Sequence, residues 1–154
     1  MSSKTSILLR CLIFGEDMDK EEILKRCNAI CRNTLMETLD IDFVDVGDDF
    51  LTARMPVTQK VHQPDGVLHG GASVALAESV GSAASYIFLD TNNYAIRGLE
   101  ISANHTRSKK EGHVFATARF LHKGRTTQLW EIKITDEENE LISICKLTTI
   151  ALKK

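Results

Sequence analysis

The segment 69–82, HGGASVALAESVGS, combines residue types that could carry out acid–base chemistry with a pair of glycines. Glu78 is its one acidic residue, and its neighbours are mostly Ala, Val and Leu. A carboxylate in such surroundings is costly to desolvate unless it has polar partners. Burial also raises the pKa of a carboxyl group, which makes it a better base near neutral pH. The segment therefore predicts a catalytic carboxylate at Glu78.

Polar and glycine residues flank Glu78 at spacings that could support this role. Ser82 follows four residues later, so its hydroxyl can share one helix face with the carboxylate. His69, Gly70 and Gly71 stand where the helix would begin, with unpaired backbone N–H groups and the positive end of the helix dipole. Glycine lets a substrate carbonyl approach those N–H groups, as an oxyanion hole requires. Each feature alone has a structural explanation, such as a turn or a solvent-facing side chain, but their combination is more specific.

Two helices are predicted to position these residues. The Ala-rich run His69–Phe88 indicates a helix that is buried nearly all round. Earlier in the chain, Asp19 followed by Glu22 fits a helix start, and apolar residues then recur at helical spacing as far as Thr38. This pattern predicts an amphipathic helix of about five turns.

Strands are predicted both before and after the buried helix in the sequence. Two short ones lie at 42–46 and 50–56, and four longer ones at 95–107, 113–122, 126–135 and 141–152. The longer segments alternate apolar and polar residues, which is typical of strands with one buried face. Short turn-like segments separate them, so we expect antiparallel neighbours. The fold class is therefore α+β, a long antiparallel sheet with one buried helix across it and an additional N-terminal helix.

Composition limits the classes of protein to consider. The chain has 154 residues, the size of one domain, and we assign 1–18 as an N-terminal extension and 19–154 as the domain. The net charge of −2 argues against a general binder of nucleic acid or of anionic membranes. Arg10 interrupts the apolar run Ile7–Phe14, which is too short to span a bilayer. We expect no signal peptide and a cytoplasmic protein, whose first 18 residues form an extra strand or a mobile arm.

Neither a metal nor a cofactor is expected. The four cysteines form no paired Cys-x-x-Cys motif, so small buried thiols are the simplest interpretation. His62 and His69 are seven residues apart across a proline-containing loop, which is not a convincing metal-binding pair. Dinucleotide-binding and P-loop glycine patterns are absent from the sequence.

The stretch 66–82, GVLHGGASVALAESVGS, resembles the hotdog-fold acyl-CoA thioesterases. It is most similar to the branch with a catalytic Glu on the helix, which includes hydroxybenzoyl-CoA, phenylacetyl-CoA-pathway and aryl-carrier-protein thioesterases. Further similarities are the segments 55–57 (MPV), 103–107 (ANHTR) and 147–149 (LTT), and the resemblance extends from about Asp19 to the C-terminus. It implies a hotdog fold and hydrolysis of an acyl-CoA, in which CoA is part of the substrate rather than a cofactor.

The resemblance implies a role for each matching residue of the catalytic site. Glu78 would attack the thioester as a nucleophile or activate water as a general base. The Gly70 N–H and the Gln63 side chain would polarise the thioester carbonyl. His69 would position the thioester and its leaving sulfur, and Ser82 would hold the water or the attacking carboxylate.

The resemblance also implies residues that bind the rest of the substrate. His105 would lie near the acyl group, and Ser79 would be a further substrate contact. Basic residues near turns would meet the CoA phosphates, although an ordinary solvated charge explains them equally well. The residues of this predicted phosphate site are Arg107, Lys109, Lys123, Gly124 and Arg125.

Family sites of this kind form between two subunits, so the resemblance implies a homodimer in which Glu78 and Gln63 come from different chains. We also expect a homotetramer of such dimers, whose arrangement the sequence leaves open. Two alternatives stay open at this point. A hotdog hydratase or dehydratase would pair a catalytic His with an Asp or Asn on the helix. A non-enzymatic acyl-CoA-binding module would keep the fold without the reaction. The acyl group is expected to be aryl or medium-chain.

Overall fold

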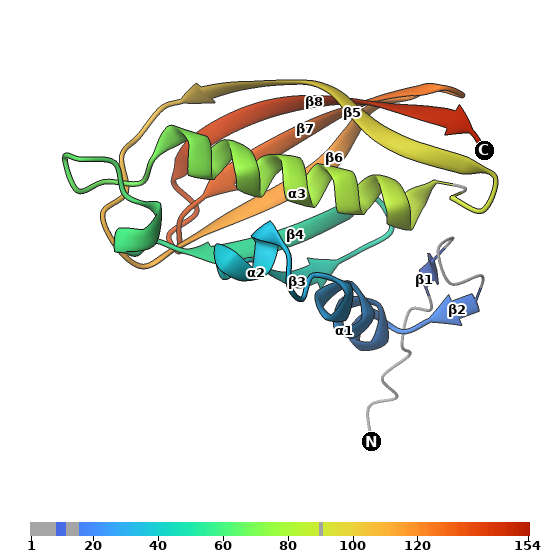
Figure 1. Ribbon diagram of the computed structural model, residues 1–154, viewed down its shortest axis with the longest axis horizontal. Helices are drawn as coiled ribbons and strands as arrows, with labels where there is room; N and C mark the ends of the chain where they lie inside the picture. The colour runs from blue at the N-terminus through green and yellow to red at the C-terminus, as the bar shows by residue number, and fades with distance from the viewer. Residues whose placement is uncertain (1–8, 12–15, 90) are drawn as a thin grey trace.

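A six-stranded antiparallel sheet forms the body of the protein in the computed structural model, which describes residues 9–11, 16–89 and 91–154. The strand order is β3-β4-β6-β7-β8-β5. The strands are β3 (Asp42–Val46), β4 (Phe50–Pro56), β5 (Tyr94–His105), β6 (His113–Lys123), β7 (Thr127–Thr135) and β8 (Leu141–Lys153). The long helix α3 (Gly70–Phe88) lies across one face of this sheet (Figure 1). The predicted α+β architecture is confirmed.

Alternation of buried apolar residues with half-buried residues along the strands explains why α3 packs on this face. Leu51, Ala53 and Met55 of β4 are fully buried, and the residues between them are half-buried. Trp130 and Ile132 of β7 follow the same period of two, so one face of the sheet is largely apolar. The resulting core buries the helix against the sheet, which is the main source of its stability.

The N-terminal helical region differs from the prediction. Helix α1 (Lys20–Ile30) begins as expected, with the Asp19 side chain accepting a hydrogen bond from the Glu22 N–H at 2.9 Å. The predicted five-turn helix is wrong, however, because α1 ends at Ile30 and a separate one-turn helix, α2 (Leu35–Thr38), follows. Asn33 has a φ of 59°, which an α-helix does not continue through, and the Thr34 hydroxyl caps α2.

The strand neighbours differ from the prediction at one place. β5 does not pair with β6 but with β8, at the edge of the sheet, while β6 lies between β4 and β7. The connection 106–112 crosses the ends of the intervening strands, where the Lys109 carbonyl accepts from the Leu68 N–H and the Gly112 carbonyl from the Val57 N–H, both at 2.8 Å. Seven extended residues reach about 23 Å, enough to pass strands spaced about 4.8 Å apart. The short connection between β5 and β6 therefore does not require these two strands to be neighbours in the sheet.

The first 18 residues include a small two-stranded sheet, formed by β1 (Leu9–Cys11) and β2 (Glu16–Met18). The other residues of the apolar run Ile7–Phe14 lie outside the described part of the chain. In the ranges that the structure describes, none of the helices combines the length and apolar character needed to cross a membrane.

Candidate active site

The first turn of α3 presents one unused hydrogen-bond donor. His69 is the N-cap, and its Nδ1 accepts a hydrogen bond from the Gly71 N–H at 2.8 Å. The N–H groups of Ala72 and Ser73 both donate to the His69 carbonyl, at 3.0 and 3.2 Å. Within the described ranges, the Gly70 N–H has no acceptor. Because Nδ1 of His69 accepts, the ring proton sits on Nε2, so both Gly70 and His69 can donate to a ligand.

A cavity of about 330 Å³ opens beside this donor. Its lining includes Gln63, which follows the short 3-10 helix η1 (Gln59–Val61), together with Gly70 and His105. A Cβ atom at residue 70 would lie 2.7 Å from Nε2 of His105, so a side chain there would displace the imidazole. Nδ1 of His105 lies 2.8 Å from the Ser143 hydroxyl, which fixes the ring over Gly70. The structure thus brings Gln63, Gly70 and His105 together.

The Glu78 carboxylate lies elsewhere, at the middle of α3. Its side chain is half-buried rather than buried as predicted, because one flank of α3 is open to solvent. The Ser82 hydroxyl donates to Oε1 of Glu78 at 3.2 Å, as the four-residue spacing predicted. The Ser79 hydroxyl donates to the Ala75 carbonyl at 2.7 Å, so Ser79 has a hydrogen-bond partner within its own helix.

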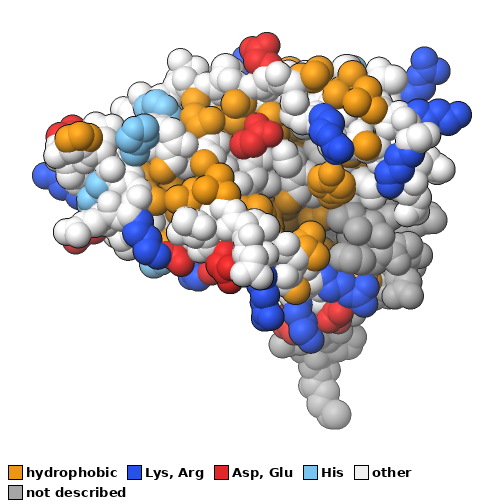
Figure 2. All heavy atoms as spheres, viewed as in Figure 1, with side chains coloured by type: hydrophobic (Ala, Val, Ile, Leu, Met, Phe, Trp, Pro, Cys, Tyr) orange, Lys and Arg blue, Asp and Glu red, His pale blue; other side chains and the backbone are white. Residues whose placement is uncertain are grey.

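Glu78, Ser79 and Ser82 line a second cavity of about 450 Å³, between α3 and the N-terminal helices. Its other lining residues are all mainly apolar: Cys27, Ile30, Cys31, Met36, Phe43, Ala83 and Tyr86. Figure 2 shows hydrophobic side chains gathered over the face that carries α3 and β5, with Asp or Glu side chains among them. The lining contributed by α1, α2 and β3 was missed by the sequence analysis, because only the tertiary fold brings these elements beside Glu78.

Two of the predicted phosphate-binding cations are engaged by carboxylates. Arg107 forms an ion pair with Glu140 at 2.7 Å. Lys109 contacts Glu137 at 2.6 Å and Asp136 at 3.6 Å. The hydrogen bond between Lys109 and Glu137 lowers the pKa of Glu137 to about 2 and raises the pKa of Lys109. Both groups are therefore charged at neutral pH, and a phosphate would have to compete with these carboxylates.

The other predicted cations lie at the opposite end of the sheet. Lys123 ends β6 and donates to the Phe88 carbonyl at 3.1 Å, and Gly124 forms the β6–β7 turn, where its N–H donates to Thr127 at 3.0 Å. Arg125 in this turn is exposed. Within one chain the four cations therefore lie in two groups, because β6 separates Lys123 from the Arg107 end by about 30 Å at 3.3 Å per residue.

The Lys123 end also carries further Lys and Arg residues, as Figure 2 shows near the C-terminus. Arg97 and Lys153 belong to the paired ends of β5 and β8. In the described part of the chain, three cationic side chains at this end donate hydrogen bonds to backbone carbonyls. They are Arg97, Lys123 and Lys154. Among the described residues, these three cations therefore bond to backbone carbonyls, whereas Arg107 and Lys109 at the other end pair with carboxylates.

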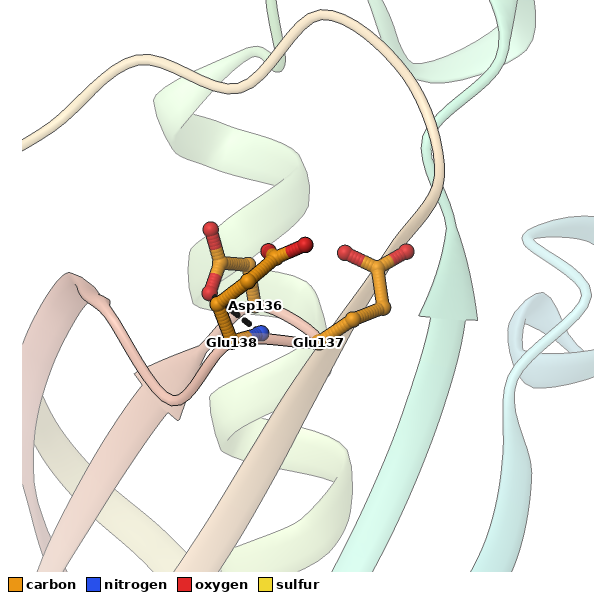
Figure 3. A group of neighbouring side chains, drawn as sticks. All are labelled: Asp136, Glu137 and Glu138. Atoms are coloured by element: carbon orange, nitrogen blue, oxygen red, sulfur yellow. Dashed lines mark hydrogen bonds between the residues drawn. The ribbon is translucent and has the colours of Figure 1, made fainter.

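An acidic triplet in the β7–β8 turn, Asp136, Glu137 and Glu138, could be mistaken for a metal site (Figure 3). Two of its three carboxylates, those of Asp136 and Glu137, already have partners from the protein. The Asp136 carboxylate accepts the N–H groups of Glu138 and Glu140 at 3.0 and 2.9 Å, and Glu137 accepts from Lys109. These contacts tie the turn to the crossover connection, which gives the triplet a structural role.

The thiols whose environment is described are buried, as predicted for Cys27, Cys31 and Cys145. Burial raises the pKa of the Cys145 thiol to about 11. Burial, and then the Asp42 carboxylate, raises the pKa of the Cys31 thiol. These two groups are therefore thiols rather than reactive thiolates at neutral pH.

Comparison with known proteins agrees with this arrangement. Residues 65–143 match the family model of the thioesterase superfamily. The 1,4-dihydroxy-2-naphthoyl-CoA hydrolase of Escherichia coli is 46% identical over 129 residues, which cover 84% of this chain and 94% of that protein. The proofreading thioesterase EntH of Cronobacter turicensis is 43% identical over 129 residues, with coverages of 84% and 93%.

A solved structure gives the same result for the fold. The crystal structure of a mutant thioesterase from Pseudomonas aeruginosa superimposes with a TM-score of 0.83 at 44% sequence identity, covering 85% of this chain and 94% of that one. The fold agrees with these matches in its sheet order and central helix. The matches cover most of the chain, and the relatives are named thioesterases or a CoA hydrolase. The chain belongs to the thioesterase superfamily and is a thioester hydrolase with the hotdog fold.

Proposed function

We propose that this enzyme hydrolyses aryl- or medium-chain acyl-CoA thioesters to the free acid and CoA, with Glu78 as the reacting carboxylate. One observation carries the proposal: the Glu78 carboxylate, bonded to Ser82, lies at the wall of a cavity of about 450 Å³ lined mainly by apolar groups. An apolar acyl group suits such a wall, while the thioester carbon would meet the carboxylate. The names of two relatives, one a hydrolase of an aryl-CoA and the other a thioesterase, support the same reaction class.

In the proposed reaction, water and the thioester become a carboxylic acid and a thiol. Glu78 either attacks the carbonyl carbon, forming an anhydride that water opens, or removes a proton from water as it attacks. The Gly70 N–H and the Gln63 amide donate to the carbonyl oxygen as negative charge develops on it. Nε2–H of His69 stands beside this donor and can stabilise the departing sulfur.

Distances within one chain support a site built from two subunits. Gly70 and Glu78 are eight residues apart on α3, which is about 12 Å along the helix axis. The Glu78 carboxylate lies against Gly98, whereas Gly70 lies against His105, about 23 Å further along β5 at 3.3 Å per residue. A thioester carbonyl held by the Gly70 N–H and attacked by Glu78 would span only about 7 Å between the two protein atoms. The two groups also open into different cavities. We therefore propose that Glu78 acts with Gly70 and Gln63 of a partner chain.

Strand β5 is the edge through which we expect two chains to pair, because β8 is its one neighbour in the sheet. Glu78 lies against Gly98 of β5, and Gly70 lies against His105, seven positions further along the same strand. An antiparallel pair of β5 strands centred between Ile101 and Ser102 would place Gly98 opposite the partner's His105. The two halves of the site would then face each other across the dimer axis, and two such dimers could form a tetramer.

The reaction is tested by release of free thiol from a panel of acyl-CoA substrates. We expect aryl or medium-chain acyl-CoA to be hydrolysed without added metal, and a chelator to leave the rate unchanged, because the proposed chemistry uses protein groups alone. Background rates across the panel, or a strict need for a divalent ion, would contradict the proposal.

A second prediction concerns the CoA phosphates. We place them at the Lys123 end because Lys123 donates to a backbone carbonyl, whereas Arg107 and Lys109 are paired with carboxylates. The double variant Lys123→Gln/Arg125→Gln should raise KM about tenfold, the scale of lost charge-assisted hydrogen bonds, and weaken its salt dependence. The kcat should be unchanged, because these residues stand apart from the reacting carbonyl.

Lys133→Gln is the matched control, since it removes an exposed cation that pairs with Glu131 on β7. Its KM should equal that of the wild type. An unchanged KM for the double variant, together with a raised KM for Arg107→Gln, would place the phosphates at the opposite end of the sheet.

A further inference from the structure

We infer that Gly98 is a positioning residue for the Glu78 carboxylate, an inference that rests on the proposed role of Glu78. Gly98 lies in β5, directly beside a β-bulge. It pairs with Thr149, whereas Glu100 pairs with Thr148, so two steps along β5 correspond to one step along β8. Such bulges bend a strand locally and often lie beside active sites, where they redirect a side chain.

The absence of a side chain at residue 98 matters because the Glu78 carboxylate lies in the space that it would fill. A Cβ atom there would be 2.5 Å from Oε1 of Glu78, 3.5 Å from Cδ and 3.7 Å from Oε2. These three atoms are the nearest neighbours of that position, and all belong to Glu78. The close approach of the carboxylate therefore requires a residue without a Cβ atom.

Backbone geometry gives no competing reason for glycine at this position. Gly66 and Gly112 have positive φ angles, of 77° and 82°, which other residues rarely adopt. Gly98 is not among the described glycines with positive φ. The backbone at residue 98 would accept alanine, so the contact with Glu78 remains as the reason for glycine.

Gly98 and Ser82 together fix which oxygen of the carboxylate can react. Oε1 accepts the Ser82 hydroxyl at 3.2 Å and packs against the backbone of Gly98. Among the described residues, no side-chain or backbone donor is bonded to Oε2. The bulge thus restrains Oε1 and leaves Oε2 as the oxygen that attacks the thioester or accepts the proton from water.

An added methyl group would displace this carboxylate by a distance that matters for catalysis. An ordinary contact between Cβ and oxygen is at least 3.4 Å, so Oε1 would have to move by about 0.9 Å (3.4 − 2.5). The moving atom is the end of a flexible side chain, so the fold can absorb the change. A misplacement of about 1 Å at a reacting group costs up to about a hundredfold in rate.

The test is a double-mutant cycle with Gly98→Ala and Glu78→Gln, assayed on one acyl-CoA. We expect Gly98→Ala to lower kcat by about 10- to 100-fold, with KM within about twofold and the melting temperature nearly unchanged. In the Glu78→Gln background, Gly98→Ala should cause no further loss, because its effect passes through the carboxylate.

The outcomes separate this inference from the proposed function. A normal kcat for Gly98→Ala beside an inactive Glu78→Gln would overturn the inference alone, as would a Gly98→Ala loss of equal size in both backgrounds. A normal kcat for Glu78→Gln would overturn both. If Gly98→Ala does not fold, Glu78→Ala/Gly98→Ala should restore folding by removing the side chain that clashes. A double variant that also fails to fold would show that Gly98 serves the fold rather than Glu78.

Discussion

Glu78→Gln is expected to lower kcat by at least about a hundredfold, the scale of a lost acid–base group, in a protein that folds normally. The amide keeps the size of the side chain and can still accept the hydrogen bond from Ser82. It carries no negative charge, so it can neither attack the thioester nor take a proton from water. KM should change little, because the apolar cavity and the Gly70 donor remain. The measurement is a steady-state thiol-release assay beside a melting curve for each protein.

Glu78→Asp should be nearly as impaired, although it keeps the charge. Removing one methylene withdraws the carboxylate from Gly98 and from the reacting carbon by about 1 Å, a loss of alignment rather than of basicity. Ser79→Ala is the matched control, because its hydroxyl is bonded to the Ala75 carbonyl in the same helix and the change leaves the carboxylate in place. If Ser79 contacts substrate, as the resemblance implies, its loss should appear in KM. A folded Glu78→Gln protein with the kcat of the wild type would remove Glu78 from the reaction.

The features that the sequence predicted well are those that depend on local interactions. Asp19 as the start of α1 follows from capping preferences, and the cap occurs. The start of α3 at His69 follows from the change to an Ala-rich pattern there, and His69 is its N-cap. The spacing of Glu78 and Ser82 follows from helix geometry, and their hydrogen bond occurs. Such contacts lie within one or two turns, so the sequence order alone brings the partners together.

The features that the sequence did not predict depend on residues far apart in the chain. The pairing of β5 with β8 joins strands more than thirty residues apart, and a short connection to β6 wrongly suggested another neighbour. The apolar wall beside Glu78 is formed by Met36 and Phe43, among others, which reach it through the packing of the N-terminal elements. The break after Ile30 was hidden because the apolar spacing continues across Asn33 and Thr34.

Gly98 is an intermediate case, because its signal was present in the sequence. An isolated glycine within a strand pattern indicates a bulge or the close approach of another group. The sequence could not say which group approaches, since Glu78 lies twenty residues earlier and meets Gly98 through the packing of α3 on β5. The structure identifies that group as the one acidic side chain of the helix.

The claim that Glu78 acts with Gln63 of the partner subunit predicts rescue between two impaired chains. Gln63→Ala should lower kcat by about a hundredfold, the scale of one lost oxyanion donor, while its Glu78 remains intact. The Glu78→Gln chain has the opposite combination, an intact Gln63 and no reacting carboxylate. In a dimer that combines one chain of each kind, one of the two shared sites would contain both intact residues, and the other site would contain both defects.

The most direct measurement is therefore the activity of this mixed dimer, co-expressed with two different affinity tags and purified through both. A site shared between subunits predicts about half of the wild-type kcat per dimer, because one of two equivalent sites is intact. Dimers that carry the two tags on identical Glu78→Gln or Gln63→Ala chains serve as controls and should stay inactive. If the mixed dimer is no more active than these controls, Glu78 and Gln63 do not meet across the subunit boundary, and the active site is not shared between two subunits.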